Sequence, residues 1–172
     1  MIQVKGEGMT SQELANYFNQ YGLIVILIIM YLEGLNLTGI PALVLLPAIG
    51  IFINYSSYGF FVVLVISILG SMLGNITYYL IIKCVGPRVY NYFYNKFKNI
   101  RKSLDKAQKL NEKHGNKVCL IGRIMPGIRT VVTLLTATFG MDIKNFIIYS
   151  LGGITIWNLV LILLGYVAGK LL

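Results

Sequence analysis

Charged residues are scarce in this chain. Only 12% of its 172 residues are Asp, Glu, Lys or Arg, whereas soluble domains average about 25%. Asp and Glu together number six and histidine occurs once, while 56% of the residues are hydrophobic and the mean hydropathy is positive. This composition excludes a soluble globular domain and predicts an all-α, multi-pass membrane protein with a single membrane domain over residues 10–172.

The residues that usually build catalytic and metal centres are also few. Cys84 and Cys119 flank a basic segment that we expect in the reducing cytoplasm, so they predict neither a disulfide nor a metal site. His114 lies in a Lys-rich polar stretch, where a solvated side chain is expected. The sequence contains no Ser/His/Asp set, metal cluster or phosphate-binding glycine loop. We therefore expect no enzyme activity, no cofactor and no metal.

The N-terminal residues have no long apolar run. Residues 1–9 predict a disordered leader, in which Met9 is a second candidate start. Thr10 and Glu13 then form a capping-box pattern, and apolar residues follow at helical spacing. Residues 10–21 are therefore predicted to form an amphipathic helix at the membrane surface.

Two apolar segments are too broken to cross a bilayer as one helix, which takes about 20 apolar residues. Residues 22–54 contain two short apolar runs separated by Gly, Asn, Thr and Pro, and residues 118–141 are interrupted at Pro126. Each segment predicts a re-entrant helical hairpin. Non-helical backbone at this depth is tolerated where it lines a wet cavity or is buried in protein, so we expect the hairpin tips to face a cavity.

Residues 60–82 and 146–169 are predicted to be full transmembrane helices. Between these spans, residues 83–117 contain most of the Lys and Arg residues but only two acids, Asp105 and Glu112. This imbalance predicts a cytoplasmic segment that contacts anionic headgroups. Because the segment is tethered to the bilayer and carries no nucleic-acid-binding motif, nucleic acid is not an expected partner.

The two halves of the chain show a short internal repeat. Residues 75–86 have the same Asn-to-Gly spacing as residues 158–169, and Gly39-Ile40-Pro41 matches Gly127-Ile128-Arg129. With residues 83–117 in the cytoplasm, the first hairpin enters from outside and the second from inside. The sequence thus predicts inverted repeats, which typically place a binding site near the midplane, where broken helices meet.

Arg123 and Arg129 are the strongest functional signal. An arginine at bilayer depth costs roughly 2.5–3.5 kcal/mol on insertion scales, and these two lie in an apolar segment on either side of Pro126. A guanidinium offers a planar fork of donors suited to phosphate. The pair is therefore predicted to bind a lipid phosphate. The alternative is that both side chains reach the cytoplasmic headgroups or pair with Glu33.

Glu33 is the acid in the apolar part of the chain. Its carboxylate could balance an arginine, exchange a proton or contact an amine headgroup, although a helix-end glutamate at the interface is the simpler interpretation. The predicted cavity lining is completed by Asn36, Thr38, Pro41, Asn75 and Pro126. Asn75, Tyr79 and Trp157-Asn158 are expected as interhelical hydrogen-bond partners more than as ligands, and the glycines Gly70, Gly74 and Gly86 are expected to serve close helix packing.

The motif Gly122-Arg123-x-x-Pro126-x-x-Arg129, followed by Gly140-Met141 and Trp157-Asn158, resembles the signature of the DedA (SNARE-associated, VTT-domain) membrane proteins. The resemblance covers about residues 20–170. It implies a bacterial cytoplasmic membrane protein with two re-entrant hairpins that moves undecaprenyl phosphate or phosphatidylethanolamine between leaflets. It also implies essential roles for Glu33, Arg123 and Arg129.

Two departures from that family pattern bear on mechanism. Pro41-Ala42-Leu43 stands where many members have a second acid, and Asn75 stands where many have another. Members proposed to use the proton gradient rely on paired acids, so passive or weakly coupled exchange is expected. A lone acid beside two arginines complements a zwitterion, which slightly favours phosphatidylethanolamine over undecaprenyl phosphate.

Other functions and partners stay open at this point. A proton-coupled ion or small-solute transporter is the main alternative, and a structural adaptor that docks a partner through the basic segment is a third. The sequence leaves self-association into a homo-oligomer open.

Overall fold

The computed structural model describes residues 11–37, 41–85, 87–96, 101–102, 105–106, 109, 112–113, 115–124, 129–138 and 140–171. Within these ranges the chain forms helices and turns, with no strand. The elements are α1 (Ser11–Gly34), α2 (Ala42–Tyr55), α3 (Phe60–Val85), α4 (Pro87–Lys96), the short 3-10 helix η1 (Gly115–Lys117), α6 (Val118–Ile124), α7 (Arg129–Thr138) and α8 (Ile143–Leu171). The predicted leader, residues 1–9, lies outside the described residues.

Two helices are long and apolar enough to cross a membrane. These are α3, with 26 residues, and α8, with 29 residues. At 1.5 Å per residue, 20 residues already cover the roughly 30 Å hydrocarbon core. The two spans predicted from hydropathy are confirmed as helices, and both extend a few residues further than expected.

The first apolar segment breaks where the sequence predicted. The turn after α1 has Asn36 at φ 59°, and the amides of Asn36 and Leu37 donate to the carbonyls of Glu33 and Leu32. This is the hydrogen-bond pattern of a Schellman cap, in which Asn tolerates the left-handed conformation. Toward its N-terminus, α1 continues as one helix through residues 21 and 22. The boundary predicted there, between a surface helix and the first hairpin, is therefore not a break in the helix.

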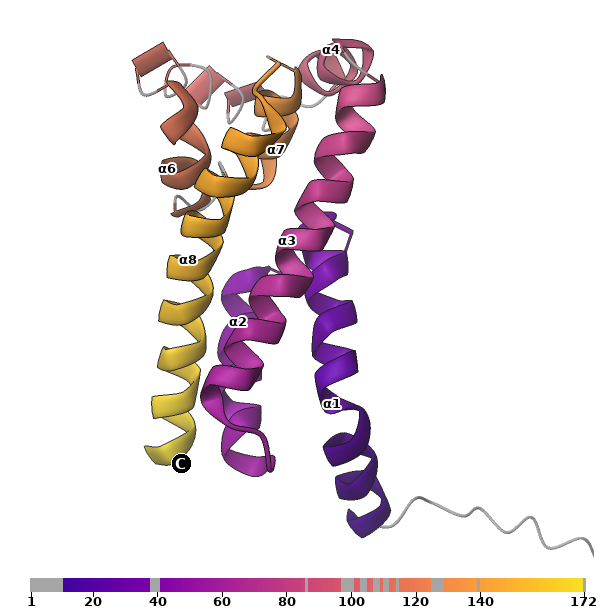
Figure 1. Ribbon diagram of the computed structural model, residues 1–172, viewed down its shortest axis with the longest axis vertical. Coiled ribbons are helices and arrows are strands. Elements are labelled where there is room, and N and C mark those ends of the chain that lie inside the picture. Colours follow the sequence, from indigo (N-terminus) through magenta and orange to yellow (C-terminus); the bar gives the residue numbers. More distant parts are fainter. Residues whose placement is uncertain are drawn as a thin grey trace, which may run out of the picture.

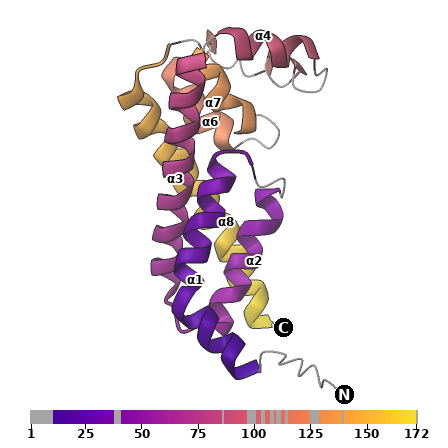
Figure 2. The same cartoon turned by 90° about the vertical axis from the view of Figure 1, so that its right-hand side faces the viewer.

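The shorter helices occupy opposite ends of the molecule, while α3 and α8 run along most of its length. In Figures 1 and 2, α1 and α2 lie in the lower half and α6 and α7 in the upper half. In the lower half, α1 packs on α3 and α2 packs on α8; in the upper half, α6 packs on α8 and α7 packs on α3. The end of α1 and the start of α7 therefore approach each other along α3.

Glycines allow these helices to approach closely. A Cβ atom on Gly74 of α3 would lie 2.1 Å from the Tyr31 carbonyl oxygen of α1, and one on Gly165 of α8 would lie 2.0 Å from the Pro47 carbonyl oxygen of α2. A Cβ on Gly70 would lie 2.7 Å from the Leu27 carbonyl oxygen. The prediction that Gly70 and Gly74 serve close helix packing is confirmed.

Gly165→Ala is expected to destabilise the fold by about 1–3 kcal/mol, because the new methyl group has to displace backbone rather than a mobile side chain. Thermal unfolding of the purified protein in detergent should show a lower Tm. Gly59→Ala is the matched control, since a Cβ there has nothing within 4 Å. An equal Tm for the two variants would contradict the α2–α8 contact.

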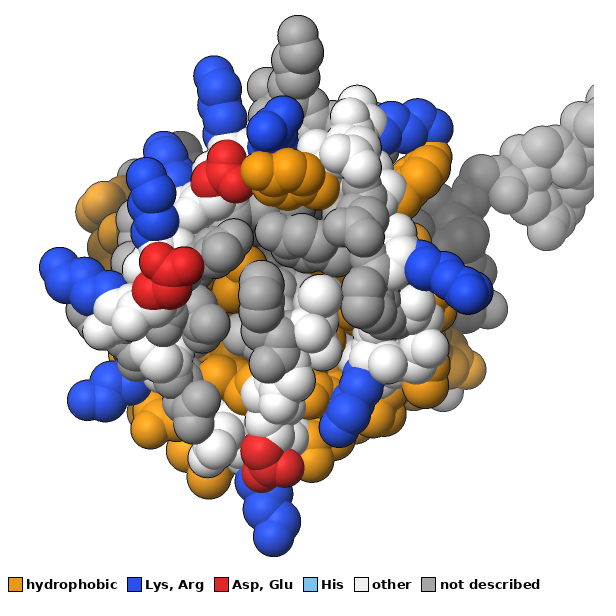
Figure 3. Space-filling view, turned by 90° about the horizontal axis from the view of Figure 1, so that it is seen from above, with side chains coloured by type: hydrophobic (Ala, Val, Ile, Leu, Met, Phe, Trp, Pro, Cys, Tyr) orange, Lys and Arg blue, Asp and Glu red, His pale blue; other side chains and the backbone are white. Residues whose placement is uncertain are grey.

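Basic residues gather at the α4 end of the molecule. Figure 3 looks onto this end and shows Lys and Arg side chains around its rim. The exposed ones include Lys83, Arg88, Lys96, Lys102 and Lys117. Both the last residues of α8 and the start of α1 lie at the other end (Figure 2).

Candidate functional site

Arg123 points into the protein. Its side chain, in the last turn of α6, is only 1% exposed, and it is the largest fully buried side chain in the described part of the chain. Gly153 of α8 makes room for it, because a Cβ there would lie 3.0 Å from the Arg123 Cβ and 3.3 Å from its Cδ. The packing of α6 on α8 therefore carries the guanidinium toward α3 and α7.

The guanidinium is held by polar groups from two other helices. Its Nη1 donates to Oδ1 of Asn75 in α3 at 2.9 Å, and its Nη2 donates to Oγ1 of Thr133 in α7 at 3.2 Å. Thr133 in turn donates to the same Asn75 oxygen at 3.3 Å. The guanidinium carbon also lies 5.5 Å from the centre of the Phe146 ring in α8, within cation–π range.

Asn75 is oriented by its own helix. Its Nδ2 donates to the Ser71 carbonyl at 2.7 Å, which leaves Oδ1 as the atom that faces Arg123 and Thr133. An amide oxygen accepts hydrogen bonds without bringing a negative charge. Asn75 and Thr133 therefore fix the direction of the guanidinium without neutralising it.

Arg129 is the first residue of α7 and lies one turn before Thr133. Residues four apart share a helix face and are about 6 Å apart along the axis, so Arg129 starts on the face that Thr133 presents to Arg123. The N-terminus of a helix also carries partial positive charge. The described part of Arg129 is its backbone; its side chain and Pro126 lie outside the described residues.

The end of the first hairpin reaches the same place on α3. A Cβ on Gly34, the last residue of α1, would lie 2.5 Å from the Ser71 carbonyl oxygen and 3.0 Å from the Asn75 nitrogen. Glu33 is the preceding residue and is half-buried. The structure thus brings the Glu33 end of α1, Asn75 and Arg123 to neighbouring positions around one turn of α3.

The other predicted lining residues are not part of this buried cluster. Asn36 is exposed in the turn after α1, and Pro41 is exposed at the start of α2. Thr38 lies outside the described residues. Of the predicted hydrogen-bonding residues, Tyr79 donates through its hydroxyl to the Met141 carbonyl, and Asn158 donates to serines of α3, as predicted.

Thr133 was not predicted from the sequence. It is 1% exposed and is the one contact that ties α7 directly to the guanidinium among the hydrogen bonds described here. A hydroxyl in an apolar helix usually bonds to the carbonyl one turn before it, as Thr136 and Thr138 do. The available signal was the four-residue spacing of Thr133 from Arg129, which places both on one face.

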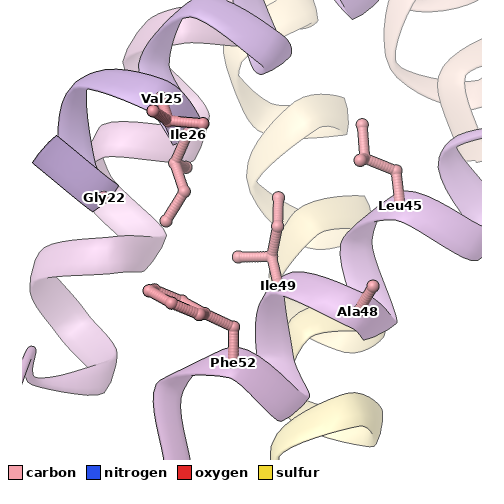
Figure 4. Close-up of a pocket in the computed structure, with 7 residues that line it drawn as sticks. All are labelled: Gly22, Val25, Ile26, Leu45, Ala48, Ile49 and Phe52. Carbon is pink, nitrogen blue, oxygen red and sulfur yellow. The ribbon is translucent and has the colours of Figure 1, made fainter. Parts of the chain in front are cut away.

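An apolar groove lies apart from this cluster, between α1 and α2 (Figure 4). It has a volume of about 200 Å³ and is lined by Gly22, Val25, Ile26, Leu45, Ala48, Ile49 and Phe52. Its lining side chains are all apolar, so the groove suits hydrocarbon and not a charged headgroup. Ile26 lies eight residues, about two turns, before Gly34, the end of α1 that contacts α3 at Ser71 and Asn75.

Comparison with known proteins identifies relatives that match most of the chain. The family model described as the VTT domain matches residues 40–167. A membrane protein of Buchnera aphidicola is 29% identical over 154 residues, which cover 87% of this chain and 58% of that protein. The protein named undecaprenyl phosphate transporter A of Staphylococcus aureus is 28% identical over 158 residues, covering 90% of this chain and 77% of the relative.

A protein of Lactococcus lactis named alkaline phosphatase-like is 26% identical over 156 residues, covering 88% of this chain and 72% of the relative. This chain spans 58% and 59% of the length of two Buchnera relatives. No solved structure matches it. The match to the VTT model takes in α2, α3, Arg123, α7 and most of α8. The chain therefore belongs to the VTT-domain family of membrane proteins, the DedA family that its double-arginine motif resembles.

Proposed function

We propose that this protein moves undecaprenyl phosphate from one leaflet of the bacterial cell membrane to the other. The observation that carries the proposal is the buried guanidinium of Arg123, which helices from both halves of the chain hold beside α3. A cation at bilayer depth is costly, and in membrane proteins it usually marks a substrate pathway. A phosphate is the ligand that matches its charge and its fork of donors.

Arg129 completes the phosphate site in this proposal. It is the first residue of α7, so its charge adds to the positive end of that helix, where a cation is unfavourable unless an anion is present. A phosphate between Arg123 and the start of α7 would be attracted by both arginines and by the backbone amides of the first turn.

We propose that Glu33 balances the positive charge of the arginines when no phosphate is bound. Gly34 contacts the turn of α3 that contains Asn75, which supports a position for Glu33 at the edge of the arginine cluster, by which we mean Arg123 with its partners Asn75 and Thr133. A carboxylate at this edge would compensate the arginines between lipids and give way when a phosphate arrives. With Asn75 in place of a second acid, we expect passive or weakly coupled exchange.

The way in which the helices of the two halves pack on each other supports inverted repeats. In the first half α1 packs on α3, and in the second half α6 packs on α8; the second helix of each pair, α2 or α7, packs on the long helix of the other half. The repeat also aligns Gly70 with Gly153, since each lies five residues before the repeated asparagine. This fits the packing, because Gly70 faces α1 and Gly153 faces α6. In our proposal the two pairs are re-entrant hairpins that enter from opposite membrane faces, with the α4 end in the cytoplasm.

The choice of lipid follows from the relatives and the groove. One relative is named an undecaprenyl phosphate transporter, which outweighs the slight preference for phosphatidylethanolamine drawn from the sequence. The groove between α1 and α2 is open and wholly apolar, so it would receive a length of prenyl chain while the phosphate lies near Arg123. The rest of the chain would stay in the bilayer, and no bond would be made or broken.

A phosphatase-protection assay tests this proposal. The purified protein is reconstituted into vesicles with labelled undecaprenyl phosphate in both leaflets, and a water-soluble phosphatase is added outside. We expect hydrolysis of nearly all the lipid with the protein and of the outer-leaflet share without it. A parallel assay uses headgroup-labelled phosphatidylethanolamine.

Three outcomes distinguish the candidate functions when the two lipid assays are combined with an ion-flux measurement on vesicles that contain the protein. Movement of phosphatidylethanolamine alone would change the substrate. Ion flux without movement of either lipid would favour the ion transporter. No movement of lipid or ion would remove the transport proposal.

A further inference from the structure

Three polar side chains are fully buried between the two spanning helices, between Asn75 and the start of α3. They are Ser67 and Ser71 of α3 and Asn158 of α8, each 0% exposed. We call them the polar seam. Ser67, Ser71 and Asn75 follow one another at four-residue intervals and share a helix face. Ser67 lies eight residues before Asn75, which corresponds to about 12 Å along the helix. The seam therefore extends about 12 Å from Asn75, the partner of Arg123, toward the start of α3.

Hydrogen bonding in the seam is incomplete. Asn158 donates through Nδ2 to the Ser67 and Ser71 hydroxyl oxygens at 3.4 and 3.5 Å, which are long distances for hydrogen bonds. Its Oδ1 is buried and has no hydrogen-bond partner among the described residues. A buried acceptor without a donor destabilises the protein. Such a group in an otherwise apolar helix calls for a donor from outside the protein.

The seam is continuous with the arginine cluster. Ser71 uses its hydroxyl toward Asn158 and its carbonyl toward Nδ2 of Asn75, whose Oδ1 accepts from Arg123. The opposite face of α3 is different, because Leu69 and Leu73 there are about half exposed and face the surrounding bilayer. The polar seam therefore lies on the side of α3 that faces α8, opposite Leu69 and Leu73.

We propose that the polar seam is a second binding region, which takes up water and the hydrated phosphate headgroup after it leaves Arg123. This inference rests on the proposed function and extends it to the other half of the bilayer. Asn158 Oδ1 accepts from water, and the Ser71 hydroxyl donates to a phosphate oxygen. The Ser67 hydroxyl already donates to the Leu64 carbonyl at 2.8 Å, so it takes part as an acceptor from water. Because the seam has no charged side chain, it binds the headgroup weakly and lets it pass toward the face opposite the basic end.

Cysteine accessibility tests the seam. Cys84→Ser and Cys119→Ala remove the natural thiols, and Ser71→Cys or Ser67→Cys then introduces a nearly isosteric thiol. Membrane-embedded protein is treated with a water-soluble, cationic methanethiosulfonate reagent. Because the thiolate is the reacting form and needs water, we expect Cys at 71 or 67 to react at least about tenfold faster than Cys at a lipid-facing position.

Leu73→Cys and Leu69→Cys are the matched controls, since they lie on the same turns of α3 but face outward. Added undecaprenyl phosphate is expected to slow labelling at position 71 and leave position 73 unchanged. If Cys at 71 reacts as slowly as Cys at 73, the seam is dry and this inference is wrong. That result would leave the phosphatase-protection assay, and with it the proposed function, to be judged separately. Equal melting temperatures of the four variants establish that all are folded.

Discussion

Arg123→Met is expected to lower the rate of undecaprenyl phosphate transfer at least about a hundredfold. The variant keeps most of the buried volume but removes the charge and the donors that would hold the phosphate. Losing one member of a buried, hydrogen-bonded charge pair typically costs about 2–5 kcal/mol, and a factor of ten corresponds to about 1.4 kcal/mol. The phosphatase-protection assay measures the rate.

A structural role for Arg123 has to be separated from a role in binding. Arg123→Met alone removes a donor from Asn75, so it could disturb the fold. The double variant Arg123→Met/Asn75→Leu replaces the buried polar pair by apolar side chains of similar volume, a change that is often neutral or stabilising. We expect this variant to keep the melting temperature of the parent and still lack transport.

Two results would contradict the phosphate role. One is a folded double variant that transports lipid at the parent rate. The other is full activity of Arg123→Met itself. Arg123→Lys should recover only part of the activity, because an ammonium keeps the charge but not the planar fork that reaches Asn75 and Thr133 together.

Asn75→Asp is expected to lower transport at least about tenfold. The new carboxylate would lie where Oδ1 now accepts from Arg123 at 2.9 Å. At an effective dielectric constant near 20, opposite charges about 4 Å apart attract each other by about 4 kcal/mol. This attraction would compete directly with the phosphate for the guanidinium, so the rate and the apparent affinity for the lipid should both fall.

The transport rates of two variants at this position distinguish the effect of an added charge from the effect of a lost hydrogen bond. Asn75→Ala removes the acceptor but adds no charge, whereas Asn75→Asp keeps the acceptor and adds one. If Arg123 binds phosphate, the rates should follow parent, then Asn75→Ala, then Asn75→Asp. If Asn75 matters only as a hydrogen-bond partner that fixes the fold, the Asp variant should be the more active of the two.

The long elements of the fold could be predicted because each depends on local composition. Uninterrupted apolar sequence predicts α3 and α8, and the left-handed turn at Asn36 and the proline at position 41 explain why α1 and α2 are separate helices. The VTT family was also predicted, because its arginine motif is compact in sequence. The two re-entrant hairpins and the inverted repeat stay predictions.

The site was predicted only in part. Arg123 stood out because a charge in an apolar segment is conspicuous. Thr133 and Thr136 lie four and seven residues after Arg129, and both spacings return to the same helix face, so spacing alone does not separate Thr133 from Thr136, whose hydroxyl bonds within its own helix. The difference arises only when α7 packs on α3 and brings Thr133 to Asn75. The serines of the polar seam were overlooked for a related reason, although their regular spacing with Asn75 on an apolar helix was visible in the sequence.

The contact between Pro47 and Gly165 also constrains biogenesis. Helix α2 packs closely along α8, and α8 is synthesised after most of the chain. At 14 residues α2 falls short of a full crossing, so during translation it lacks its main packing partner until α8 leaves the translocon. Inserted nascent chains that stop before Ile143 should therefore expose α2 to membrane quality-control proteases, even though α1 and α3 could already be paired.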